Sequence, residues 1–186
     1  MTDRLVQLLA ELSWRKGPVT LASGKVSDFY IDCKQTALNA EGALLIGARV
    51  WERIQTLRTE GHDIRGVGGL TLGADPIGLA AALASASSNA PVHAFIIRKE
   101  PKGHGTAAWL EGGANLPEGS KVVIAEDVIT TGGSTLKAIT RARESGLVPV
   151  AVSVLVDRQE GGLETVESQS GLPVYPLVTR EDFDGI

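Results

Sequence analysis

The sequence predicts an α/β protein with a mostly parallel central sheet flanked by helices and a small N-terminal element. Apolar runs of strand length alternate with helical segments between residues 64 and 156. Two of these runs, 122–125 and 150–154, consist of Val, Ile and Ala with a single Ser, as a strand buried on both faces requires. Right-handed crossovers between such strands produce a parallel sheet with helices on both sides.

Periodicity and turn residues predict the elements in order. Leucines recur at helical spacing within 2–14, and Gly17-Pro18 is expected to end that helix. Short extended segments at 19–21 and 29–31 flank a turn at 23–25. Residues 100–119 lack either periodicity and are rich in glycine, which is typical of a functional loop. The remaining predictions are helices at 41–58, 76–85 and 134–145 and strands at 64–68, 92–97, 121–125 and 148–156.

Composition limits the class of protein. A chain of 186 residues with 43% hydrophobic and 22% charged residues fits one domain, 1–186. The net charge of −4 argues against a nucleic-acid binder, which would carry a basic excess. Cys33 is the only cysteine, so no internal disulfide can form and a cytoplasmic location is expected. Because no 18 apolar residues run together, no membrane span is expected.

The most informative segment is the strand at 121–125 and the residues after it. The strand delivers Glu126 and Asp127 to the carboxyl edge of the sheet, where ligands bind in open α/β folds. Residues 130–134, Thr-Thr-Gly-Gly-Ser, then open a helix, and we call them the phosphate cradle. Bare glycines, hydroxyls and the positive helix end suit an anion, and the two acids could hold ribose hydroxyls or, through a metal ion, a diphosphate. The simpler alternative is an acidic turn followed by a helix cap.

A basic segment stands out in this acidic chain. Arg98, Lys99, Lys102 and His104 lie within seven residues, directly after a predicted strand. Such a run is more often a solvated surface, but at the edge of an α/β sheet it can close over a polyanion and supply charge during a reaction.

Four motifs, in order along residues 20–162, resemble those of one family. Residues 126–132, Glu-Asp-Val-Ile-Thr-Thr-Gly, resemble the phosphoribosyl diphosphate (PRPP) motif of type I phosphoribosyltransferases. Residues 98–105, Arg-Lys-Glu-Pro-Lys-Gly-His-Gly, resemble the catalytic loop of orotate phosphoribosyltransferases. Segments 20–32 and 156–162 supply the other two matches.

The resemblance implies transfer of ribose 5-phosphate from PRPP, accompanied by Mg²⁺, to orotate. It further implies a homodimer in which the basic loop serves the neighbouring subunit, and a hood at 1–35 that helps to bind the base. No residue is assigned as a metal ligand. The implied catalytic residues are Lys99, Lys102, His104 and Asp127. The implied PRPP-binding residues are Arg98, Lys99, Lys102, His104, Glu126, Asp127, Val128, Ile129, Thr130, Thr131, Gly132, Gly133 and Ser134, and those for orotate are Lys25, Thr130 and Arg158.

Two departures from the family leave questions open. Some members carry Tyr-Lys where this chain has Leu72-Gly73, so a lysine contact to diphosphate is missing or comes from elsewhere. Some carry a lysine where Ala22 stands, and Lys25 is its candidate substitute. The alternatives are a phosphoribosyltransferase for another base and a non-enzymatic PRPP-binding regulator; the second would be expected to bring a nucleic-acid-binding module or a basic face.

Overall fold

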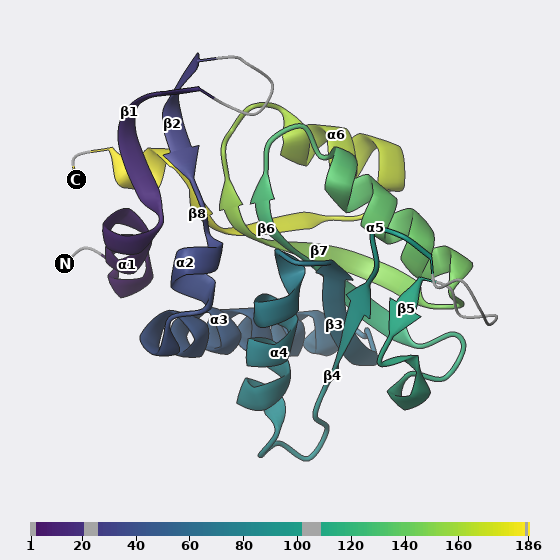
Figure 1. Cartoon of the computed structure of the whole chain (residues 1–186). Coiled ribbons are helices and arrows are strands. Elements are labelled where there is room, and N and C mark those ends of the chain that lie inside the picture. Colours follow the sequence, from purple (N-terminus) through teal and green to yellow (C-terminus); the bar gives the residue numbers. More distant parts are fainter. Residues whose placement is uncertain (1–2, 21–25, 102–108, 185) are drawn as a thin grey trace.

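The chain folds into a six-stranded sheet with helices on both faces, and an N-terminal helix and hairpin lie beside it (Figure 1). The computed structural model describes residues 3–20, 26–101, 109–184 and 186. The elements are α1 (Arg4–Leu12), β1 (Trp14–Thr20), β2 (Val26–Ile31), α2 (Lys34–Ala37), α3 (Ala40–Thr59), β3 (Ile64–Leu70), α4 (Ala74–Ser85), β4 (His93–Ile97), β5 (Leu110–Glu111), η1 (Gly113–Asn115), β6 (Lys121–Ile129), α5 (Gly133–Glu144), β7 (Val148–Asp157), α6 (Gly162–Ser170), β8 (Val174–Thr179) and η2 (Arg180–Phe183).

The sheet has the mostly parallel topology predicted from the sequence. Its strand order is β5-β4-β3-β6-β7-β8, and β5 alone runs antiparallel to its neighbour. Val123 pairs with Val67 of β3 on one side and with Ala151 of β7 on the other. The carboxyl end of β6 therefore lies in the middle of the sheet edge, where an α/β fold binds its ligands.

Two buried cores explain the uninterrupted apolar strands. Val123 and Ala125 of β6 belong to the core that α1, α3 and α4 complete, whereas Val122 and Ile124 belong to the core with α5. Since successive side chains of a strand point to opposite faces, a strand between two helical layers needs apolar residues at every position.

The N-terminal prediction was wrong in one respect. The helix α1 ends at Leu12, and Gly17-Pro18 lies inside β1 instead of ending the helix. Tertiary contacts decide this, because Trp14 packs against Phe183, with ring centroids 5.6 Å apart, and β1 pairs with β2. Gly17 has a φ of +116° at the irregularity in that pairing, a conformation that glycine accepts readily.

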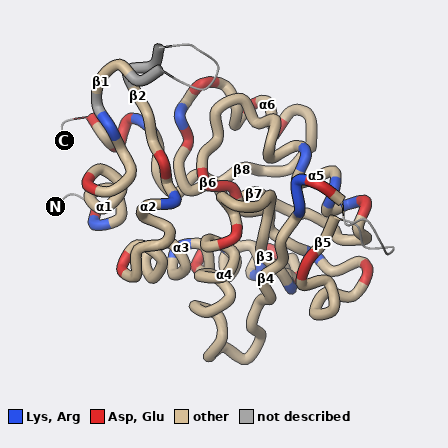
Figure 2. Tube along the Cα trace, in the orientation of Figure 1, with Lys and Arg blue, Asp and Glu red and all other residues tan. Residues whose placement is uncertain are grey.

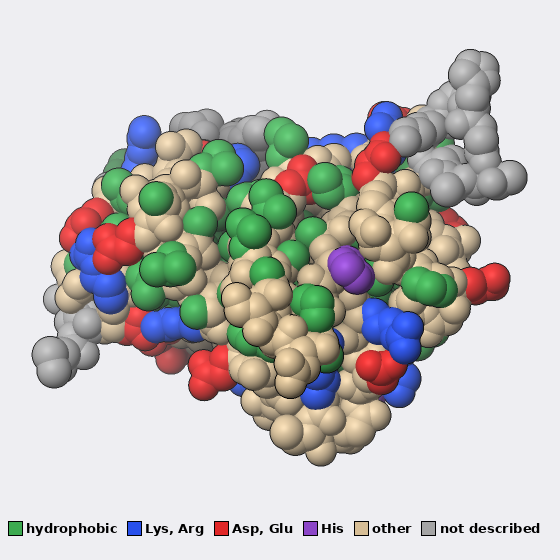
Figure 3. All heavy atoms as spheres, turned by 90° about the horizontal axis from the view of Figure 1, so that it is seen from below, with side chains coloured by type: hydrophobic (Ala, Val, Ile, Leu, Met, Phe, Trp, Pro, Cys, Tyr) green, Lys and Arg blue, Asp and Glu red, His purple; other side chains and the backbone are tan. Residues whose placement is uncertain are grey.

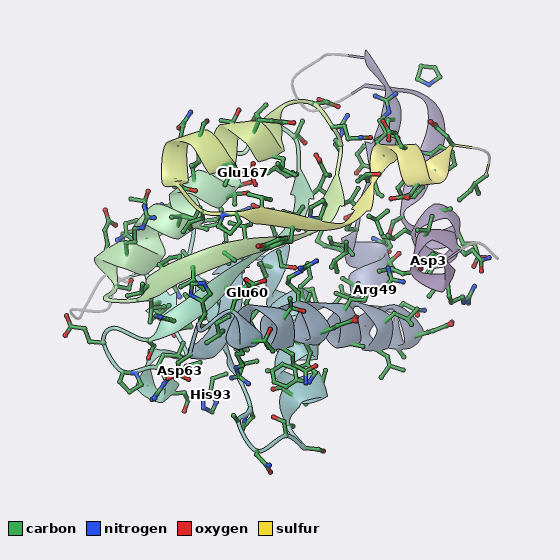
Figure 4. All side chains as sticks on the ribbon, turned by 180° about the vertical axis from the view of Figure 1, so that it is seen from behind. Asp3, Arg49, Glu60, Asp63, His93 and Glu167 are labelled. Carbon is green, nitrogen blue, oxygen red and sulfur yellow. The ribbon has the colours of Figure 1, made fainter. Side chains whose placement is uncertain are left out.

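Asp3 fixes the start of α1. Its carboxylate accepts a hydrogen bond from the Leu5 N–H (2.8 Å) and forms an ion pair with Arg49 of α3, beside which it lies in Figure 4. Asp3 therefore both caps the start of α1 and links it to α3.

Several elements differ from the prediction or were not predicted. The strand β6 continues to Ile129 instead of ending at 125, because Val128 and Ile129 pair with β7. Pro176 breaks the strand pattern of β8, and η1 with the two-residue β5 occupies part of the segment 100–119. The other unpredicted elements are α2, α6 and η2. No helix in the described part of the chain has the length and hydropathy of a membrane span.

Candidate active site

A cleft of about 270 Å³ lies at the carboxyl end of β6. It brings together five residues predicted from the sequence, although they come from three segments of the chain: Lys99, Glu126, Asp127, Val128 and Ser134. Figure 2 shows basic and acidic positions gathered near α2 and the end of β6. The remaining lining residues are Lys34, Leu70, Thr71, Leu72 and Gly73.

Glu126 is buried behind the start of α5. Its Oε2 accepts hydrogen bonds from the hydroxyls of Ser134 (2.9 Å) and Thr135 (2.8 Å). Burial, opposed in part by those bonds, raises the pKa of Glu126 to about 7. The carboxyl group therefore holds the phosphate cradle against β6, and Thr135 is a site residue that the sequence motif did not single out.

Asp127 presents the more exposed carboxylate of the pair. Its Oδ1 accepts a hydrogen bond from the Val128 N–H (3.0 Å), and its Oδ2 lies 4.0 Å from Nζ of Lys34. The backbone of Gly73 approaches so closely that a Cβ there would lie 2.4 Å from the carboxyl carbon of Asp127. Gly73 thus leaves room for Asp127 in the cleft.

The phosphate cradle has the local geometry of an anion site. Gly132, with a φ of +81°, precedes α5, and no side chain of the described residues caps this helix start. A Cβ on Gly132 would lie 2.7 Å from Cγ2 of Val166, so both conformation and space require glycine. Thr131, Gly133 and Ser134 are exposed, and the first N–H groups of a helix have no acceptor within the helix, so an anion can bind at this helix start.

The side chains of the PRPP motif differ in what they can reach. The side chain of Ile129 is buried in the core, so only its backbone can contribute to a ligand site. Val128 lines the cleft, whereas Thr130 is partly exposed but is not among the residues that line it.

Arg98, the first residue of the basic segment, is held by contacts with Trp109, Glu111 and Arg141. The N–H of Arg98 donates to the carbonyl of Trp109 (2.8 Å), and Nη1 of Arg98 lies 3.1 Å from a carboxylate oxygen of Glu111. Arg141 of α5 donates to the Arg98 carbonyl (2.5 Å) and stacks on the Trp109 ring at 3.8 Å. The described contacts of Arg98 therefore fix the base of the loop.

Lys99 extends from this base into the cleft, where its side chain is exposed. Lys102 and His104, which are also predicted to be catalytic and to bind PRPP, lie outside the described residues.

Arg158 lies next to the end of β6, on the side of the hairpin. Its backbone N–H donates to the carbonyl of Ile129 (3.1 Å), and Nη2 donates to the carbonyl of Phe29 (3.1 Å). Nη2 also lies 2.7 Å from a carboxylate oxygen of Glu160, a residue that sequence reasoning missed. The side chain of Phe29 is buried, and its ring packs edge-on against that of Phe183. Lys25, another of the three predicted orotate contacts, lies outside the described residues.

Two further features of the cleft were missed. The Thr71 hydroxyl donates to Oδ2 of Asp75 (2.6 Å), which ties the turn after β3 to the first turn of α4. The Thr71–Leu72 peptide bond in this turn is cis. Lys34 enters the cleft from α2. Asp32 ends the matched segment 20–32 and Lys34 lies two residues later, but no spacing rule relates either residue to β6.

Comparison with known proteins gives a consistent family. No protein-family model matches the chain. Curated orotate phosphoribosyltransferases are similar to it: that of Sorangium cellulosum is 47% identical over 97% of this chain and 92% of its own, and that of Aquifex aeolicus 45% over 94% and 93%. A third, from a Nostoc strain, is 48% identical over 89% of this chain and 77% of its own.

Solved structures agree with the curated relatives. The Mycobacterium tuberculosis orotate phosphoribosyltransferase in complex with Fe(III) dicitrate has a TM-score of 0.80 and 36% identity, covering 97% of both chains. The same enzyme in complex with PRPP has a TM-score of 0.74 and 32% identity, covering 96% of this chain and 95% of that one. The adenine phosphoribosyltransferase of Trypanosoma brucei, at 17% identity and a TM-score of 0.71, shares the fold alone.

Proposed function

Because the chain belongs to the orotate phosphoribosyltransferase family and is therefore a pentosyltransferase, we propose that it binds PRPP and orotate at the carboxyl end of β6. The reaction of this family moves ribose 5-phosphate from PRPP to the ring nitrogen of orotate, giving orotidine 5'-monophosphate and diphosphate in pyrimidine biosynthesis. One observation carries the proposal: a single cleft is lined by Lys99, by Asp127 and by Ser134, which belongs to the phosphate cradle.

The chemistry requires charge at fixed places and little water. As diphosphate leaves, the sugar carbon becomes cationic and negative charge grows on the leaving oxygen. In the proposed arrangement the cradle holds the 5-phosphate through N–H groups and hydroxyls, and Asp127 accepts hydrogen bonds from ribose hydroxyls. Lys99 supplies positive charge to the diphosphate, together with Lys102 and His104, whose part remains a prediction.

The residues of the cleft fit a Mg²⁺ ion that arrives with PRPP. Among the described residues no three His, Cys, Asp or Glu side chains gather into a metal-binding group. Mg²⁺ in phosphate sites commonly uses one or two carboxylates plus substrate oxygens, and Asp127 with Glu126 offers that number. When bound, the ion would neutralise charge on the diphosphate. The burial of Glu126 makes Asp127 the more accessible protein ligand.

Orotate is proposed to bind between the end of β6 and the N-terminal hairpin. Arg158 extends toward the hairpin from the end of β7, beside Thr130, and a guanidinium can hold a carboxylate through two parallel hydrogen bonds. Residues 1–35, including Lys25, are proposed to act as a hood over the base within one domain, 1–186. The buried thiol of Cys33, the only cysteine, is consistent with the cytoplasmic location that the sequence predicts.

A second copy of the chain is the proposed partner. Four leucines on and beside α3 and α4 (Leu38, Leu44, Leu79 and Leu83) are between 56% and 74% exposed. Figure 3 shows hydrophobic side chains gathered on this side of the molecule. Each such side chain gains roughly 1.5 to 3 kcal/mol when fully buried, which favours association through this face.

Subunit exchange tests the shared loop. Asp127→Asn and Lys102→Ala subunits are each expected to be inactive. If the loop crosses the dimer, random mixing should restore about a quarter of wild-type activity, because half of the dimers then hold one intact site. Mixed dimers without recovered activity would place the loop in the site of its own subunit.

The assay for the proposed reaction follows the absorbance of orotate. Wild-type protein with Mg²⁺ and PRPP should consume orotate but leave adenine, guanine and uracil unchanged. Turnover of one of those bases in place of orotate would refute the assignment of the base while keeping the phosphoribosyl chemistry. PRPP binding without turnover of any base would refute the enzyme and favour a PRPP-binding regulator.

A further inference from the structure

Lys34 reaches the cleft from an unexpected direction. It begins α2, directly after the hairpin strand β2, yet its side chain lines the same cleft as Lys99 and Asp127. Its Nζ lies 2.6 Å from Oδ1 of Asp32 and 4.0 Å from Oδ2 of Asp127. The bond to Asp32 raises the pKa of Lys34, so its ammonium stays charged at neutral pH.

The turn after β3 supplies no cation to the cleft. Leu70, Thr71, Leu72 and Gly73 form part of the cleft wall and carry no charge. A lysine cannot stand at position 73 as the cleft is built, because even a Cβ there would lie 2.4 Å from the carboxyl carbon of Asp127. A cation at this wall must therefore come from another element.

Within the described residues, Lys34 and Lys99 are the cations that line the cleft. An ammonium has three N–H donors, so the bond to Asp32 leaves donors for a second anion. The distance of 4.0 Å to Asp127 is longer than a hydrogen bond. Asp32 also accepts from the backbone N–H of Lys34 (3.3 Å) and thereby holds the start of α2 and the ammonium together.

We propose that Lys34 binds the diphosphate of PRPP, in place of a lysine from the turn at Leu72-Gly73. This assignment rests on the proposed function and deepens it. The ammonium, held by Asp32, donates to diphosphate oxygens in the substrate and in the released product. Lys34 therefore contributes to the affinity for diphosphate, whereas the phosphate cradle binds the 5-phosphate independently.

Two probes separate these subsites. Diphosphate with Mg²⁺ probes the subsite to which Lys34 is assigned. Ribose 5-phosphate, which has no diphosphate group, probes the phosphate cradle. Lys34→Met should weaken the binding of diphosphate about tenfold or more in titration calorimetry, the size expected for one charge-assisted hydrogen bond. The KM for PRPP should rise similarly, and the Kd for ribose 5-phosphate should stay unchanged, which also reports an intact fold.

Two variants serve as controls. Lys121→Met removes a lysine at the opposite end of β6 and should leave both affinities unchanged. Lys34→Arg keeps the charge and should retain most of the affinity for diphosphate.

The proposal is overturned if Lys34→Met binds diphosphate as the wild type does, or if it loses both ligands equally. It is also overturned if Lys34→Arg is as weak as Lys34→Met. Failure of the proposed reaction is a separate result: wild-type protein that binds diphosphate through Lys34 but never converts orotate would refute the reaction and keep the subsite.

Discussion

The buried carboxyl group of Glu126 should make the stability of this protein depend on pH. Burial raises the pKa of Glu126 from its usual 4.5 to about 7 in the folded chain. Between these values the folded state holds a proton that the unfolded state has released. Stability from this group is therefore complete below about pH 4.5 and falls as the pH rises toward 7.

The size of the effect follows from the two pKa values. Each pKa unit corresponds to about 1.4 kcal/mol, so the full contribution is about 3 kcal/mol, of which about 2.5 kcal/mol is lost between pH 5 and pH 8. Glu126→Gln removes this loss because the amide cannot ionise. Its carbonyl oxygen can still accept from the hydroxyls of Ser134 and Thr135, which bond the carboxyl group in the wild type.

Urea unfolding of the ligand-free protein at pH 5 and pH 8 measures the effect. We compare the free energy of unfolding of Glu126→Gln with that of the wild type at each pH. This difference, variant minus wild type, should be about 2.5 kcal/mol larger at pH 8 than at pH 5. Glu144→Gln changes an exposed glutamate at the end of α5 and should show no such increase. A Glu126→Gln difference that is the same at both pH values would refute the reasoning about burial.

Three further predictions concern the cleft. Lys99→Ala should lower kcat far more than it weakens PRPP binding, because its charge acts mainly on the leaving group; equal losses in kcat and in the measured Kd would contradict this role. Gly73→Ala should lower kcat/KM about tenfold or more by displacing the Asp127 carboxylate. Gly113→Ala, whose Cβ meets only the end of the Leu110 side chain, is its control and should keep full activity. Arg158→Lys should raise the KM for orotate about tenfold and leave that for PRPP unchanged, since an ammonium cannot form the two parallel hydrogen bonds of a guanidinium. A rise in both KM values would indicate general damage to the site.

The sheet was predictable from the sequence because its central strands are buried on both faces. An uninterrupted apolar run of strand length, such as 122–125, indicates a strand that is buried on both faces. The position of the same run predicted that Glu126 and Asp127 lie toward the carboxyl end of this strand. Elements that depend on distant partners were harder to predict. The strand β8 contains Pro176 and alternates poorly, and β1 exists because Trp14 and its neighbours pair with β2 and pack on η2.

The site was predictable where one short segment carries it. The phosphate cradle has its geometry encoded locally, through glycines at a helix start. Lys34 could not be placed, because its distance to Asp127 depends on how separate elements pack. The different roles of Glu126 and Asp127 likewise depend on burial: both line the cleft, but Glu126 is buried and accepts hydrogen bonds from the start of α5, whereas Asp127 is the more exposed of the two.

The most direct measurement of the central claim is phosphorus NMR of PRPP incubated with the protein and Mg²⁺. With orotate present, we predict that PRPP disappears while orotidine 5'-monophosphate and free diphosphate appear in equal amounts, and that Asp127→Asn slows this strongly. Without orotate the PRPP signals should persist. Release of diphosphate with ribose 5-phosphate, at the same rate whether or not orotate is added, would contradict phosphoribosyl transfer at this cleft.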